Sequence, residues 1–155
     1  MDLIKCWLWK KKFSKVKALL YNATNDEVKK IISQTKDREI LYVYTYNYNW
    51  DNGFEIPQAV LDNNKCDLSI ALLIFYSADG LNYLVEKSYD ADLPQWSSFI
   101  KKLYDSILER KYQKGEIEFK VPLSKVQLYK LKKMLTEQEK IFIENIEGKC
   151  LDIDC

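Results

Sequence analysis

The stretch NYNWDNGFEIPQAVLDNNKCDLSIALLIFYSADG, residues Asn47 to Gly80, decides the fold. A Trp lies within a run of Asn and Asp, a Gly follows, and apolar segments flank this polar turn. Asp67 is a favourable N-cap for Leu68 to Ala78, a segment that is apolar on nearly every side. We therefore expect Leu68 to Ala78 to be the central, most buried helix. Asp79-Gly80 is expected to close it, with Gly80 in the left-handed conformation.

Helical spacing and capping residues predict further helices on both sides of this stretch. Before the stretch, we expect a helix within 3–21 and a second one capped by Thr24, Asn25 or Asp26; within it, a helix from Pro57 to about Asp62. After it, we expect a helix from Asp92 and Pro94 to near Gly115 and another capped by Ser124. The last expected helix begins at Thr136, with Glu139 three residues on, and ends at Gly148.

The segment Tyr42 to Tyr48 fits two secondary structures. Its tyrosines alternate strictly, which is typical of a strand. The same segment places Ile40, Leu41 and Tyr44 on one helical face. Asp37 is a candidate N-cap, and the neighbouring segments are helical, so we favour a helix.

Together these patterns predict an all-α fold: a compact domain of seven or eight short antiparallel helices that resembles a helical repeat, with at most one minor strand or hairpin. The segment Glu116 to Val121 alternates like a strand but has no evident partner. We expect one globular domain over residues 1–148 and a loose tail over 149–155. Two free thiols at Cys150 and Cys155 fit this tail better than a loop disulfide.

Composition excludes several classes of function. The chain has 155 residues, a net charge of +1, no histidine and four glycines. Nucleophile pairs that use histidine and metal sites that use histidine are therefore excluded. With four glycines, neither of the common glycine-rich phosphate loops can form. The longest uncharged run is about half of the roughly 20 residues that span a bilayer. We expect a cytoplasmic protein without a cofactor or a membrane partner.

Charge and aromatic residues give the candidate site. The first twenty residues are rich in lysine, whereas residues 47–95 are rich in carboxylates. An EF-hand does not fit, because Gly53 comes one residue late and Gln58 occupies the twelfth position. Some candidates also have a purely structural explanation. Asp51, Asp67 and Asp79 fit a role as helix caps or turn residues instead of binding residues, and Trp50 and Phe54 fit a role as packing residues. The candidate binding residues are Asn49, Trp50, Asp51, Phe54, Glu55, Asp62, Asp67 and Asp79. We assign no catalytic or metal-binding residue.

The same stretch resembles the core of a bacterial family, domain of unknown function 4274. The matching elements are Asn47 to Pro57, Cys66-Asp67-Leu68, Ala71 to Phe75 and Asp79-Gly80, within about Asp37 to Leu84. Asn52 replaces a second Asp that is common in the family, and Ser69-Ile70 replaces Gly-Thr. Both changes weaken the case for a charged catalytic cluster. The resemblance implies an all-helical fold, which supports a helix over Tyr42 to Tyr48, and it implies no activity.

We expect non-catalytic protein binding, most concretely an immunity-like protein whose acidic surface neutralises a basic toxin domain. The alternative is a carboxylate-dependent enzyme, with or without a metal, centred on Asn47 to Gly80. The lysines at 10–12, 15 and 17 raise nucleic-acid binding, but a solvated helix face explains them better because the segment carries no arginine and no recognition motif. The sequence does not define the oligomeric state.

Overall fold

The computed structural model describes residues 3–151 and 153. Its contacts group the chain into two units. Unit 1 runs up to Cys66 and includes the described residues after Cys150, and unit 2 runs from Asp67 to Cys150. The regular structure of the described residues is helical, without a sheet, so the predicted all-α class is confirmed.

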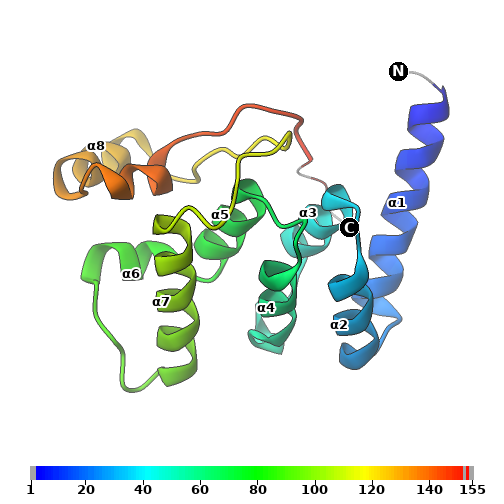
Figure 1. Ribbon diagram of the computed structural model, residues 1–155, viewed down its shortest axis with the longest axis horizontal. Helices are drawn as coiled ribbons and strands as arrows, with labels where there is room; N and C mark the ends of the chain where they lie inside the picture. Colours follow the sequence, from blue (N-terminus) through cyan, green and yellow to red (C-terminus); the bar gives the residue numbers. More distant parts are fainter. Residues whose placement is uncertain (1–2, 152, 154–155) are drawn as a thin grey trace. The chain divides into compact units, whose positions relative to one another are not determined.

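Unit 1 contains four α-helices, in which α1 packs on α3 and α2 on α4 (Figure 1). A capping box starts α2, because the Thr24 hydroxyl accepts from the Glu27 N–H while the Glu27 carboxylate accepts from the Thr24 N–H. A short 3-10 helix, Trp50–Asn52, occupies the predicted polar turn. The α-helices are α1 (Leu3–Tyr21), α2 (Asn25–Gln34), α3 (Arg38–Tyr46) and α4 (Glu55–Asp62).

Most of the segment that fitted two structures lies in helix α3, as favoured from its neighbours. The helix ends at Tyr46, and Tyr48 lies beyond it. Asp37 caps it, with its side chain accepting from the Glu39 N–H at 3.0 Å. Alternate tyrosines become pairs four residues apart on the helix: the ring centroids of Tyr42 and Tyr46 lie 6.5 Å apart. The alternation typical of a strand thus places Tyr42 and Tyr46 in a stacked pair at helical spacing.

Unit 2 is built around α5 (Leu68–Ser77), which packs on α6 and α7 (Figure 1). The Asp67 carboxylate caps α5 through the Ile70 N–H at 3.0 Å, as predicted. All but three of the ten residues of α5 are buried, which confirms its central position. The other elements are α6 (Gly80–Glu86), α7 (Pro94–Leu108), α8 (Lys125–Met134) and the 3-10 helix η2 (Gln138–Ile143).

The predicted end of the central helix at Asp79-Gly80 is wrong in detail. Asp79, not Gly80, takes the left-handed conformation (φ 59°), and Gly80 begins α6, which the sequence did not predict. A Cβ on Gly80 would lie 2.4 Å from the Phe75 carbonyl oxygen, so the glycine permits a close approach instead of a positive φ.

Two other predicted boundaries also differ. Helix α7 ends at Leu108 instead of near Gly115, and the element after Thr136 is a 3-10 helix that ends at Ile143, before Gly148. Beyond η2 the chain pairs with the strand-like segment, since Phe119 and Ile146 exchange backbone hydrogen bonds of 2.9 and 2.8 Å. The partner that the sequence did not reveal lies far along the chain, as the bridged pairs Phe119–Ile146 and Ile117–Lys149 show.

The end of the described chain returns to unit 1. The sequence predicted a loose tail from residue 149, whereas the Leu151 side chain is 1% exposed. The Asn47 amide donates to the Ile153 carbonyl at 2.7 Å. Cys150 is exposed, and the predicted state of Cys155 lies outside the described residues.

Candidate functional site

Exposed carboxylates and apolar side chains gather where α6 ends and the chain crosses to α7. Glu86, Asp90 and Asp92 are exposed, as are Tyr89 at 61% and Leu93 at 55%. We call these five residues the acidic loop surface. Beside it lies an open hollow of about 350 Å³, lined by Asn82, Tyr83, Glu86, Ser88, Tyr89, Asp90, Ala91 and Trp96.

Hydrogen bonds within the loop and to α7 fix the conformation of this loop. The buried Ser97 hydroxyl accepts from the Asp90 N–H at 2.8 Å and donates to the Asp90 carbonyl at 3.2 Å. The Asp90 carboxylate accepts from the Asp92 N–H at 2.9 Å, and the Trp96 indole donates to the Ala78 carbonyl at 2.7 Å. The carboxylates are therefore presented on an ordered backbone, which lowers the entropy lost when a partner binds.

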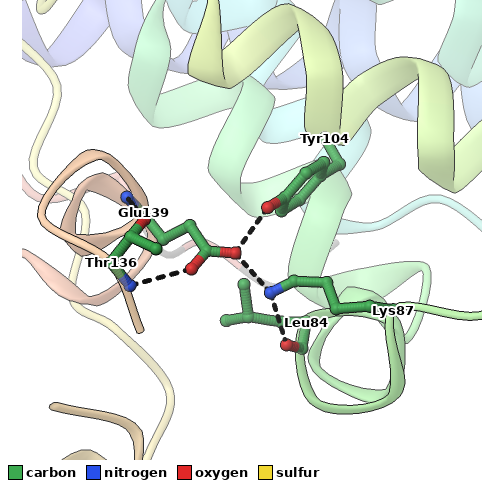
Figure 2. Close-up of polar contacts among 5 residues, drawn as sticks. All are labelled: Leu84, Lys87, Tyr104, Thr136 and Glu139. Carbon is green, nitrogen blue, oxygen red and sulfur yellow. Dashed lines mark hydrogen bonds and ion pairs between the residues drawn. The ribbon is translucent and has the colours of Figure 1, made fainter. Parts of the chain in front are cut away.

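The lysine of this loop directs its charge inward (Figure 2). Lys87 has a left-handed backbone (φ 51°), and its ammonium donates to the Leu84 carbonyl at 2.9 Å. The same ammonium donates to the Glu139 carboxylate and lies 5.3 Å from the centre of the Tyr104 ring. The Lys87 side chain remains 36% exposed, and its ammonium is paired with Glu139 and not with the three carboxylates of the acidic loop surface.

Glu139, at the start of η2, is the acceptor that organises this interior cluster (Figure 2). Its carboxylate also accepts from the Tyr104 hydroxyl and, at 2.9 Å, from the Thr136 N–H. Burial raises the pKa of Glu139, but the hydrogen bonds from Lys87, Tyr104 and Thr136 outweigh it and hold the pKa at about 2. Burial and the Glu139 carboxylate raise the pKa of Tyr104.

Aromatic rings surround the cluster and connect it to the core of unit 2. The Tyr104 ring stacks on Phe142 with centroids 5.1 Å apart and meets Tyr83 edge-on at 5.2 Å. Phe142 in turn contacts Phe75 of α5 at 4.7 Å. The saturated hydrogen bonding and this packing give Glu139 a structural role: it anchors the start of the loop through Lys87.

Six of the sequence-predicted residues lie in unit 1, around the polar turn and α4. Asn49 caps the 3-10 helix through the Asp51 N–H at 3.1 Å, and Asp51 itself is exposed. Glu55 forms an exposed ion pair with Lys29 at 2.5 Å. The Asp62 carboxylate accepts a hydrogen bond from the Gln58 amide at 2.8 Å. The half-buried Trp50 ring lies 5.3 Å from Tyr48 and 6.5 Å from Phe54, measured between ring centroids.

The other two predicted residues lie in unit 2 and have different environments. Asp67 is 2% exposed and caps α5, so it is not part of an accessible surface. Asp79 is exposed at the junction of α5 and α6. Sequence reasoning included Glu86, Asp90 and Asp92 in its acidic region without selecting them, and it missed Lys87 and Tyr104. Only the Thr136–Glu139 capping spacing indicated a role for Glu139.

In the described part of the chain, no group of three Cys, Asp or Glu side chains could hold a metal ion. Over residues 3–151 and 153, no single helix combines the length and apolar composition needed to cross a bilayer. Helices α5 and α6 together have that length and composition, but the pair is bent by 82°.

These features define an all-helical protein with an ordered acidic loop. Residues 36–108, just under half of the chain, match the family described as Domain of unknown function (DUF4274). The match confirms the resemblance and extends past the predicted core to include the acidic loop surface and α7. No curated protein and no solved structure matches the chain.

Proposed function

We propose that this chain is a non-catalytic binding protein that recognises a basic protein through the acidic loop surface. The concrete form of the proposal is an immunity-like protein in the bacterial cytoplasm that neutralises a basic toxin domain. The observation that carries it is the inward ion pair of Lys87 with Glu139, which leaves Glu86, Asp90 and Asp92 as the outward charges of the loop.

The chemistry of the surface suits recognition of a basic protein. Carboxylates that share one surface steer a cationic partner during diffusion and suppress acidic competitors. Tyr89 and Leu93 of the same surface are also exposed, and tyrosine is a common energetic centre of interfaces. The adjacent hollow of about 350 Å³ could receive one lysine or arginine side chain of the partner against Glu86 and Asp90.

The test is co-purification of the tagged protein with partners from its own organism's lysate, read by mass spectrometry. The variant Glu86→Gln/Asp90→Asn/Asp92→Asn removes the three charges with little change of shape. A matched control neutralises three other exposed carboxylates of unit 2, as Glu109→Gln/Glu116→Gln/Glu147→Gln. We expect the wild-type and control proteins to retain one stoichiometric basic protein, and the loop variant to lose it.

Co-expression then tests neutralisation directly. The retained protein should arrest growth when expressed alone, and the wild-type chain, but not the loop variant, should restore growth. If all three proteins retained the partner equally, the contact would lie outside the acidic loop surface. A basic partner without toxicity would support binding but contradict the immunity role.

A further inference from the structure

A second surface of unit 2, between α6 and α8, is apolar instead of acidic. An open groove of about 270 Å³ lies there, and its lining is largely apolar. Val85 on one wall and Met134 on the other are 45% and 51% exposed, and Leu131 forms the buried floor. The complete lining is Leu81, Val85, Gln127, Lys130, Leu131 and Met134.

Helix α8 buries one residue and exposes three large apolar side chains, Val126, Tyr129 and Met134. The reciprocal Ser124–Gln127 capping box starts this ten-residue helix, and Leu131 is its one buried residue. Val126 and Tyr129 on the neighbouring face are 63% and 61% exposed. The groove residues of α8 recur at 127, 130, 131 and 134, which places them along one face of the helix. Large apolar side chains that are exposed together on one element mark an interaction site.

The rim of the groove on the α8 side is basic. The sequence from Lys120 to Thr136 contains five lysines and no carboxylate. Lys130 lines the groove itself, and Lys133 lies over the Tyr129 ring at 4.2 Å, on the adjacent face of α8. On α6 the nearest carboxylate in sequence is Glu86, next to Val85. The groove therefore combines an apolar lining with positive charge along one side.

We propose that this groove binds an amphipathic helix of a partner protein whose apolar stripe is flanked by acidic residues. Apolar side chains spaced at i, i+3 or i+4 and i+7 would enter between Val85 and Met134. The acidic flank would face Lys130 and Lys133, which gives the bound helix a direction.

Other occupants fit the groove less well. At about 270 Å³ and open to solvent, it is smaller than the roughly 300–1,000 Å³ of sites that enclose a small molecule. Nucleic acid would need stacking platforms or arginine forks, whereas the groove offers aliphatic walls and lysine. A lipid surface is met by projecting side chains and not by a concave floor such as Leu131.

This groove is separate from the acidic loop surface, so the inference does not depend on the proposed function. Val85 of α6 lines the groove, while Glu86 of the same helix belongs to the acidic loop surface. A partner of the groove would be acidic, and a partner of the loop would be basic. Substitutions at the two surfaces therefore have distinguishable effects.

The probe is a displayed library of random peptides of about 16 residues, long enough for several helical turns. Selection uses the wild-type protein, with counter-selection on Val85→Glu/Met134→Glu, which puts two carboxylates on the walls of the groove. We expect enriched peptides to share helically spaced apolar residues and an excess of Asp and Glu. Fluorescence anisotropy with the purified best peptide then measures affinity.

Each substitution has its own expected result. Val85→Glu/Met134→Glu should weaken binding at least about tenfold, and Lys130→Gln/Lys133→Gln should weaken it and flatten its salt dependence. The matched control is Leu8→Glu, which also places a carboxylate at a half-exposed apolar position but belongs to neither proposed surface, and it should leave the affinity unchanged. Circular dichroism melts verify that every variant folds.

Several outcomes would overturn the proposal. They are the absence of any peptide that survives counter-selection, enriched peptides without acidic excess, and an affinity that Leu8→Glu lowers as much as the groove variant. The proposal would equally be overturned if another occupant filled the groove. The occupants to test are duplex DNA, vesicles of phosphatidylcholine and phosphatidylglycerol, and a second copy of the chain, which sedimentation would detect.

Discussion

At the scale of single residues, the Glu139 carboxylate makes a prediction about stability. Glu139→Gln should lower the free energy of unfolding by about 2 kcal/mol near neutral pH, because it leaves the Lys87 ammonium without its counter-charge. The difference between wild type and variant should shrink as the pH falls from the ordinary value of 4.5 toward about 2, because folding lowers this pKa and the wild-type carboxylate is then protonated.

Urea unfolding over this pH range measures the effect. Glu137→Gln is the matched control, since Glu137 is an exposed carboxylate paired with Lys140, and it should change the free energy of unfolding by less than about 1 kcal/mol. A loss at Glu139→Gln that stays constant from neutral to acid pH would contradict the role of the ionised carboxylate.

Capping residues were predictable from sequence because a cap acts on an N–H two or three residues away. Asp67, Thr24 and Ser124 cap their helices as their positions indicated. The partners of Glu139 were not predictable, since Lys87 and Tyr104 lie 52 and 35 residues from it in sequence. The sequence therefore did not distinguish Lys87 from an ordinary surface lysine, although its ammonium pairs with Glu139.

At the scale of elements, the junction of α5 and α6 makes the second prediction. Gly80→Ala should lower the free energy of unfolding by about 1–3 kcal/mol, because the added Cβ would lie 2.4 Å from the Phe75 carbonyl oxygen. Asp79→Gly is the control: its backbone φ of 59° suits glycine, so stability should change by less than about 1 kcal/mol. A fully stable Gly80→Ala protein would show that α5 and α6 do not approach this closely.

The same junction shows where element prediction fails. An Asp-Gly pair after an apolar helix is a common C-terminal signal, and local rules place the left-handed residue at the glycine. Here packing against Phe75 requires the glycine at Gly80, so Asp79 takes the positive φ and a new helix begins at once. The alternation of Tyr42 to Tyr48 was similarly ambiguous until the helical neighbours decided it.

At the scale of the whole molecule, the division into two units was not visible in the sequence. The boundary between the units falls between Cys66 and Asp67, and no glycine- or proline-rich stretch marks it in the sequence. The family match over residues 36–108 continues across this boundary. Composition indicated one domain because length and apolar content set only the total size of the core. The grouping depends on long-range contacts, such as the return of the Leu151 segment to unit 1.

That return makes the third prediction. Leu151→Ala should lower the free energy of unfolding by about 2–4 kcal/mol, because Leu151 is 1% exposed and its removal leaves a cavity. Hydrogen–deuterium exchange should quicken in peptides of α3, whose C-cap Asn47 donates to Ile153, more than in peptides of α7. Leu8→Ala, at a 46% exposed leucine of unit 1, should leave both unchanged. Faster exchange in α7 alone would place the Leu151 segment with unit 2.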